Sequence, residues 1–99
     1  MAHEIVLAPR AKRDLTKLYD YLEERAGSRL AQSYVDRLDA LFDLLADFPG
    51  IGAPRPELGS MIRSTGLWPY VVLYRVSDTS VHILRIVHGR RNITAEILK

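Results

Sequence analysis

Two apolar stripes with helical spacing, joined by only a short Gly-Ser link, constrain the fold of this chain more than any other feature. The first stripe follows Pro9, a residue suited to the first turn of a helix. Gly27 suits a helix stop and Ser28 an N-cap, so the short link predicts an antiparallel helical hairpin. The stripe positions are Ala11, Leu15, Leu18 and Leu22 in the first helix and Ala31, Tyr34, Val35, Leu38, Leu41, Phe42 and Leu45 in the second.

The second half of the chain changes from helical to strand patterning. The segment FPGIGAPRPELG (48–59) holds three prolines and three glycines in twelve residues and predicts a loop. The short connections between the segments that follow predict an antiparallel meander. In a regular last strand, His82 and His88 would share a face. The three segments with strand character are SMIRS (60–64), YVVLYRV (70–76) and VHILRIVH (81–88).

The remaining segments complete an α+β architecture. HEIVLAP gives a first strand at residues 3–7, and NITAEILK predicts a short helix within residues 92–99. The expected fold is an N-terminal strand, a two-helix antiparallel hairpin, a three-stranded antiparallel meander and a short C-terminal helix, with the helices on one face of the sheet in two layers. A chain of 99 residues is one domain, 1–99, by size. These rules leave open where the first strand pairs.

Composition excludes several classes of protein. Apolar residues make up 47% of the chain and charged residues 26%, as in ordinary globular domains. The chain has no cysteine, which excludes a disulfide framework and a thiolate zinc site. The three histidines do not have metal-ligand spacing, so we expect no metal and no cofactor. No signal-peptide core is present and no apolar run approaches roughly 20 residues, so we expect a cytoplasmic protein without a membrane partner.

Charge is distributed unevenly between the two halves of the sequence. Residues 1–48 contain seven Lys or Arg against nine Asp or Glu, whereas residues 49–99 contain seven against three. The cations of the second half are almost all arginine, which suits planar, bidentate recognition of carboxylate or phosphate. Ordinary surface charge explains this pattern as well as an anion-binding function does.

The stretch ILRIVHGRRN (83–92) is the strongest candidate for a site. It brings His88, Arg90, Arg91 and Asn92 to the end of a strand, with Gly89 available to let the backbone turn there. The stretch is either a solvated strand end or a site that binds an anion or a partner. Together with Arg63 and Arg85 on the predicted strands, these arginines could bind nucleic acid or an acidic protein segment.

Three segments in this order resemble the ParE branch of the ParE/RelE toxin superfamily: FPGIGAPRPELGSMIRS, YVVLYRV and VHILRIVHGRRNI. The resemblance covers nearly the whole chain and implies the same strand, helical hairpin and meander layout. It implies the toxin of a bacterial type II toxin–antitoxin module. In such modules a ParD-like antitoxin wraps the helical hairpin and the sheet, which makes the toxin part of a hetero-oligomer.

The resemblance also implies which surface the antitoxin covers. The helix stripes and the strand YVVLYRV would be partly exposed in the isolated toxin and covered by an amphipathic antitoxin segment. The residues expected to contact the antitoxin are Leu15, Leu18, Leu22, Leu38, Phe42 and Tyr74.

The superfamily has two activities. ParE-like members inhibit DNA gyrase by binding, and RelE-like members are ribosome-dependent mRNA endonucleases. Metal-free RNA cleavage needs a base, cations and an acid, which RelE-like enzymes supply with basic residues, including lysines, on the loop and middle strands and with a catalytic tyrosine or histidine near the C-terminus. Here the only lysines are Lys12, Lys17 and Lys99, and no tyrosine follows Gly89.

The sequence therefore favours a gyrase-binding toxin without catalytic residues. The endonuclease remains the alternative, with a reduced set of cations and a base drawn from Arg63, His88, Arg90 and Arg91. The residues expected to contact the target are Arg63, Arg85, His88, Gly89, Arg90, Arg91 and Asn92.

Overall fold

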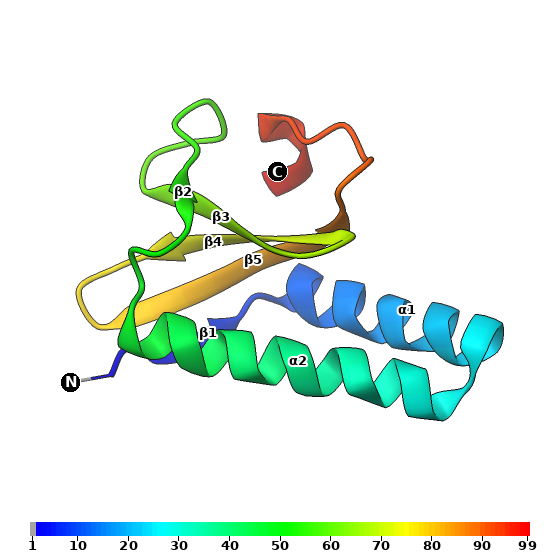
Figure 1. Cartoon of the computed structure of the whole chain (residues 1–99). Helices are drawn as coiled ribbons and strands as arrows, with labels where there is room; N and C mark the ends of the chain where they lie inside the picture. The colour runs from blue at the N-terminus through cyan, green and yellow to red at the C-terminus, as the bar shows by residue number, and fades with distance from the viewer. Residues whose placement is uncertain (1) are drawn as a thin grey trace.

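The structure, a computed structural model, describes residues 2–99; Met1, the first residue of the predicted 1–99 domain, lies outside the described residues. Figure 1 shows the helical hairpin on one face of the sheet and the C-terminal turn on the opposite face. Within residues 2–99, no helix is long and apolar enough to cross a membrane. The elements in chain order are β1 (Glu4–Leu7), α1 (Pro9–Ala26), α2 (Ser28–Asp47), β2 (Ala53–Pro54), β3 (Ile62–Leu67), β4 (Tyr70–Val76), β5 (Ser80–His88) and the 3-10 helix η1 (Ala95–Leu98).

The predicted helical hairpin is confirmed. Helix α1 begins at Pro9 and ends at Ala26, one residue before the predicted stop. Gly27 has a φ of 94°, in the left-handed region that favours glycine, and its N–H caps α1 by donating to the carbonyl of Glu23. Gly27 also occupies the N-cap position of α2. The prediction that Ser28 is the N-cap is therefore wrong, because Ser28 is already the first helical residue.

The sheet contains five strands in the order β1-β5-β4-β3-β2. The antiparallel meander of β3, β4 and β5 is confirmed. The N-terminal strand, whose pairing the sequence rules left open, pairs in parallel with β5, from Glu4 opposite Ser80 to Leu7 opposite Ile83. The two-residue β2 adds a further edge inside the predicted loop. A parallel pairing across the whole chain and a two-residue strand are both invisible to local sequence patterns.

Strand β5 carries one extra residue relative to β4. Leu73 lies opposite Arg85, but the next residue, Tyr74, lies opposite Ile83. Leu84 is therefore left without a partner in the ladder, as in a β-bulge. Because faces alternate along a strand, this extra residue reverses which residues of β5 point toward the helices.

The bulge corrects the expectation that the two histidines of β5 share a face. His88 lies opposite Tyr70, whose ring packs against the core beneath the helices. His82 lies opposite Arg75, which is an odd number of residues away from Tyr70 along the regular strand β4. His88 thus belongs to the helix side of the sheet and His82 to the outer side.

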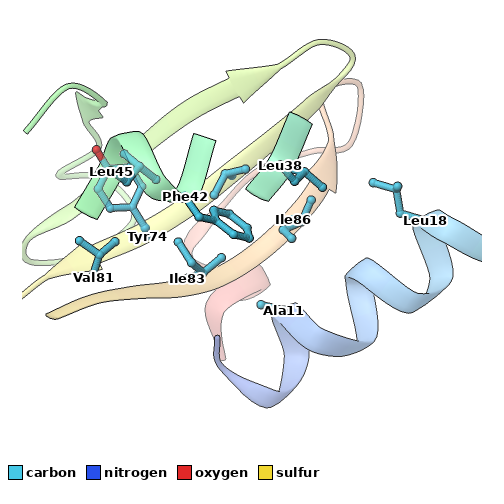
Figure 2. Close-up of a cluster of buried hydrophobic side chains, with 10 residues drawn as sticks. Ala11, Leu18, Leu38, Phe42, Leu45, Tyr74, Val81, Ile83 and Ile86 are labelled. Carbon is cyan, nitrogen blue, oxygen red and sulfur yellow. The ribbon is translucent and has the colours of Figure 1, made fainter. Parts of the chain in front are cut away.

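Two apolar clusters cover the two faces of the sheet. The larger one lies between the helical hairpin and the sheet, and Figure 2 shows helix and strand side chains meeting there. The smaller one lies on the outer face and consists of Leu58, Ile62, Leu73, Val87 and Ile97. The predicted two-layer description therefore omits a partial third layer, made by η1 and the loop before β3. The larger cluster consists of Ala11, Leu18, Leu38, Phe42, Leu45, Val72, Tyr74, Val81, Ile83 and Ile86.

A buried ion pair joins α1, β5 and η1. Arg85 is only 5% exposed. Its side chain donates from Nε to Asp14 Oδ2 at 2.7 Å and from Nη2 to Asp14 Oδ1 at 3.0 Å. Its Nη1 donates to the carbonyl oxygen of Ile97 at 2.8 Å. The hydrogen bonds that Arg85 donates to Asp14 raise the pKa of Arg85 above its ordinary value, so the guanidinium is always charged.

Asp14 also completes the backbone hydrogen bonding of β5. Strand β1 ends at Leu7, opposite Ile83, so the rest of β5 has no strand beside it on that edge in the described part of the chain. The Ile86 N–H on this edge donates instead to Asp14 Oδ2, at 3.0 Å. One carboxylate thus satisfies a buried guanidinium and a backbone amide together.

We expect Asp14→Ala to lower the free energy of unfolding by about 3–5 kcal/mol, because it leaves the Arg85 charge buried without its partner. Urea unfolding followed by circular dichroism measures this change. The matched control is Asp20→Ala, an exposed carboxylate on the same helix, with an expected effect of at most about 0.5 kcal/mol. Equal stabilities for the two variants would show that the ion pair does not hold the fold together.

Candidate functional site

Two residues of the predicted target-binding set are engaged inside the protein. Arg85 is buried in the ion pair with Asp14, so the prediction that it contacts a target is wrong. Its side chain turns around the sheet edge that β1 leaves open. Arg63 is half-buried, and its Nη1 donates to the carbonyl oxygens of Gly52 at 2.6 Å and Gly50 at 3.2 Å. Arg63 therefore holds the proline-rich loop against β3.

Tyr74 holds the same loop from the centre of the sheet. Its hydroxyl donates to the carbonyl oxygen of Pro49 at 2.8 Å and accepts from the Gly52 N–H at 2.9 Å. Burial raises the pKa of the Tyr74 phenol, which keeps it protonated and able to donate. The side chain is 0% exposed, so the prediction that Tyr74 contacts the antitoxin is wrong.

Leu38 and Phe42 are also inaccessible to a partner. They are 0% and 6% exposed and belong to the core between α2 and the sheet. The prediction that they contact the antitoxin is wrong, because the middle of the α2 stripe is covered by the protein's own strands. Leu15 and Leu22 are half-buried and pack at the margin of this core.

A groove of about 530 Å³ lies between the helical hairpin and the ends of β4 and β5. Leu18 and Leu22, both predicted to contact the antitoxin, line it. Leu18 is only 6% exposed and belongs to the core, so Leu22 is the more accessible of the two. An aromatic row crosses it: the rings of Tyr34 and Tyr70 meet edge to face at 5.8 Å, as do those of Tyr70 and His88. Burial raises the pKa of the Tyr70 phenol, so it is neutral at physiological pH. The lining is Asp14, Lys17, Leu18, Tyr21, Leu22, Tyr34, Pro69, Tyr70, Ile86, Val87, His88 and Arg91.

The predicted HGRRN segment lies at the surface beside this groove. His88, Arg90, Arg91 and Asn92 are exposed. The segment folds back on His88: its Nδ1 accepts from the Arg90 N–H at 3.1 Å, and its carbonyl oxygen accepts from the Arg91 N–H at 3.0 Å. The two arginine side chains are thereby presented from a hydrogen-bonded turn.

Gly89 is required for close packing and not for an unusual backbone angle. Its φ is outside the positive range, which corrects the expectation that glycine is needed here to let the chain turn. Its N–H donates to the carbonyl oxygen of Pro69 at 2.7 Å. A Cβ at this position would lie 3.0 Å from that oxygen and 3.6 Å from Cζ3 of Trp68. The HGRRN turn and the β3–β4 connection are therefore in direct contact.

Trp68 is a surface residue that sequence reasoning missed. It is the single tryptophan of the chain, lies in the connection between β3 and β4, and is 75% exposed. A large apolar ring in a tight connection, where small polar residues dominate, was the signal that could have found it. Trp and Arg side chains close together are typical of residues that dominate binding energy at interfaces.

A basic hollow of about 350 Å³ adjoins the groove, and both are lined by Asp14, Lys17 and Arg91. Arg10 and Arg13 complete its cationic rim around the buried ion pair. The only ion pairs within residues 2–99 are Arg55–Glu57, Arg85–Asp14 and Lys99–Glu96. Arg10 donates from Nη1 to the carbonyl oxygen of Lys99, and the other rim cations have no carboxylate partner in the described chain. The net charge of residues 1–48 is acidic and hides this cluster, whose cations come together only in the folded chain.

The fold and these surfaces place the chain in the class of ParE/RelE toxins. A family model described as "ParE toxin of type II toxin-antitoxin system, parDE" matches residues 5–93. Toxin ParE3 of Caulobacter vibrioides is 34% identical over 86 residues, covering 87% of this chain and 86% of that toxin. Toxin RelE1 of the same organism is 34% identical over 90 residues, covering 90% of this chain and 96% of its own.

A solved structure agrees with the sequence comparisons. The "Chromosomal ParDE TA system from P. aeruginosa" matches with a TM-score of 0.75 at 26% identity, covering 88% of this chain and 96% of that chain. This chain therefore belongs to the ParE toxin family of type II toxin–antitoxin systems. The predicted resemblance to the ParE branch is confirmed.

We expect Gly89→Ala to destabilise the protein by about 1–3 kcal/mol, because the added methyl group overpacks the contact with Pro69. It should also change the emission of Trp68, whose ring lies over Gly89. Denaturant unfolding and intrinsic fluorescence measure the two effects. The control is Gly50→Ala, since a Cβ at Gly50 meets no atom within 4 Å. Indistinguishable behaviour of the two variants would contradict this account of the turn.

Proposed function

We propose that this chain is a toxin that inhibits DNA gyrase by binding and that a ParD-like antitoxin neutralises it. The observation that supports binding over RNA cleavage is that the outer face of the sheet is covered by apolar side chains and offers no free cation from β5. There Leu73 and Val87 of the middle strands pack with Ile97 of the C-terminal segment. Arg85, the cation between them, is committed to Asp14.

The residues that could form a reduced nuclease site (Arg63, His88, Arg90 and Arg91) do not all lie close together. A metal-free cleavage site needs its base and cations around one phosphate. Arg63 lies opposite Tyr74 and His88 lies opposite Tyr70, four residues apart along β4. This corresponds to about 13 Å of strand. Because Arg63 is also tied to the loop carbonyls, the geometry favours a binding surface made by the HGRRN turn and Trp68.

The apolar groove supports the antitoxin part of the proposal. It combines the exposed ring of Tyr21 with Leu22 and the aromatic row, and its volume suits the apolar side chains of an amphipathic segment. The relative from P. aeruginosa is described as a ParDE system, which agrees with a ParD-like partner here. A segment seated in this groove would make the toxin part of a hetero-oligomer.

The activity is tested with purified toxin in two parallel assays: gyrase supercoiling with detection of cleavage complexes, and mRNA cleavage on translating ribosomes. We expect loss of supercoiling with trapped DNA breaks, and intact mRNA. Arg90→Ala/Arg91→Ala should weaken inhibition at least tenfold while the protein remains folded, because the exposed cations of the turn are lost. Arg25→Ala/Arg29→Ala, which removes two exposed arginines from the far end of the hairpin, should inhibit normally. Cut mRNA with active gyrase would instead establish the endonuclease.

The antitoxin site is tested by placing a charge in the groove. Tyr21→Arg should weaken binding of the ParD-like antitoxin at least tenfold, because it puts a cation where an apolar side chain would be buried. Leu44→Arg is the control, since Leu44 is an exposed apolar residue of α2 outside the groove. Isothermal titration calorimetry measures both affinities. Unchanged binding by folded Tyr21→Arg would move the antitoxin to another surface.

A further inference from the structure

We infer that one surface of this protein binds a nucleic-acid strand with unpaired bases. It is formed by Trp68 and four cations: Arg10, Arg13, Lys17 and Arg91. In this arrangement the indole ring stacks on a base while the cations contact phosphates. The surface consists of the β3–β4 connection, the HGRRN turn and the first half of α1. It does not depend on which enzyme the toxin inhibits.

Trp68 has the exposure and the support that stacking needs. Three quarters of the residue is accessible, although most tryptophans are largely buried. The ring packs near Gly89, and the hydrogen bond from the Gly89 N–H to Pro69 fixes the connection that carries it. Because the backbone of this connection is fixed, it loses little conformational entropy on binding, so more of the stacking energy is retained.

The cations of α1 form a row on one face of the helix. Arg10, Arg13 and Lys17 are spaced by three and four residues, and the row is about 10 Å long at the rise of an α-helix. Arg10 lies in the first turn, where the helix dipole adds positive potential and no acidic residue is present. Such an arrangement destabilises the helix slightly and favours a bound anion.

Arg91 connects the row to Trp68. It lines the basic hollow together with Arg13 and Lys17, and it lines the groove together with Pro69, the neighbour of Trp68. The track is therefore continuous from α1 to the β3–β4 connection. Its only carboxylate, Asp14, is neutralised by Arg85.

The lining of the hollow favours phosphates over an acidic protein segment. Its walls are formed by four cations and one ion pair, without the apolar side chains that anchor a protein partner. One of the four, Arg10, also donates from Nη1 to the carbonyl oxygen of Lys99. Cations along a groove with an aromatic ring beside them are the usual means of binding single strands without sequence preference. An acidic polypeptide is therefore the competing ligand for the experiment.

The shared residues imply competition with the groove. A segment that fills the groove covers Lys17 and Arg91, which belong to both surfaces. If the antitoxin occupies the groove, as proposed above, its binding should displace the nucleic acid. Only this consequence rests on the proposed function.

The single tryptophan permits a direct test with the full chain. A 15-nucleotide oligo(dT), titrated at low salt, should quench the Trp68 emission saturably, because stacking on a base quenches indole. In parallel, the anisotropy of a labelled oligo(dT) gives the affinity of variants. Trp68→Ala should weaken binding about tenfold, and Trp68→Phe, which keeps an aromatic face, should weaken it less.

Salt dependence tests the cations. Arg13→Ala/Lys17→Ala should reduce the slope of log K against log salt by about 1.4, since each single-strand phosphate contact contributes about 0.7. Arg25→Ala/Arg29→Ala removes the same charge elsewhere and should keep the wild-type slope. Binding without quenching, or equal slopes for the two double variants, would overturn the inference. Quenching by poly-glutamate but not by oligo(dT) would overturn it in favour of a protein partner.

Discussion

The ion pair between Arg85 and Asp14 is the interaction on which the rest of the structure depends. It lies where β1 ends and leaves one edge of β5 open, and it closes that edge with a side chain in place of a strand. Through Ile97 it also attaches the C-terminal segment to the outer face of the sheet. Because Asp14 is engaged by this pair, it is not available as a partner for Arg13, Lys17 and Arg91 around it. The buried ion pair and the positive charge of the basic hollow are thus consequences of one arrangement.

The bulge at Leu84 decides which side chains of β5 reach the functional surfaces. If β5 continued through Leu84 without a bulge, alternation from Val81 and Ile83 would turn Arg85 into the core and His88 to the outer face. With it, Arg85 reaches the sheet edge and His88 joins the aromatic row beside the groove. The outer face is left to apolar packing. A single inserted residue therefore separates the structural cation from the exposed turn.

Elements with a strong local pattern were predicted well, and contacts between distant elements were not. The boundaries of β4 and the beginning of α1 follow directly from YVVLYRV and from Pro9. In contrast, the apolar spacing of Leu38 and Phe42 is the same whether a stripe faces a partner or the protein's own sheet, so their burial could not be read from it. Tyr74 and Arg63 hold the proline-rich loop through backbone carbonyls that carry no sequence signal. The exposure of the HGRRN arginines was anticipated, but Trp68 and the cations of α1 were missed because they join that turn only in three dimensions.

The sequence by itself determined the helical hairpin, the three antiparallel strands and the exposed basic turn, because the period of apolar residues, the short links and the Gly-Arg-Arg end act over a few residues. The family could also be inferred from the order of three segments. Only the tertiary structure decided that β1 pairs in parallel with β5, that Arg85 is buried with Asp14 and that Trp68 lies beside Gly89. These features depend on contacts between residues tens of positions apart. Such contacts follow from packing and from the satisfaction of buried polar groups, which a local pattern does not contain.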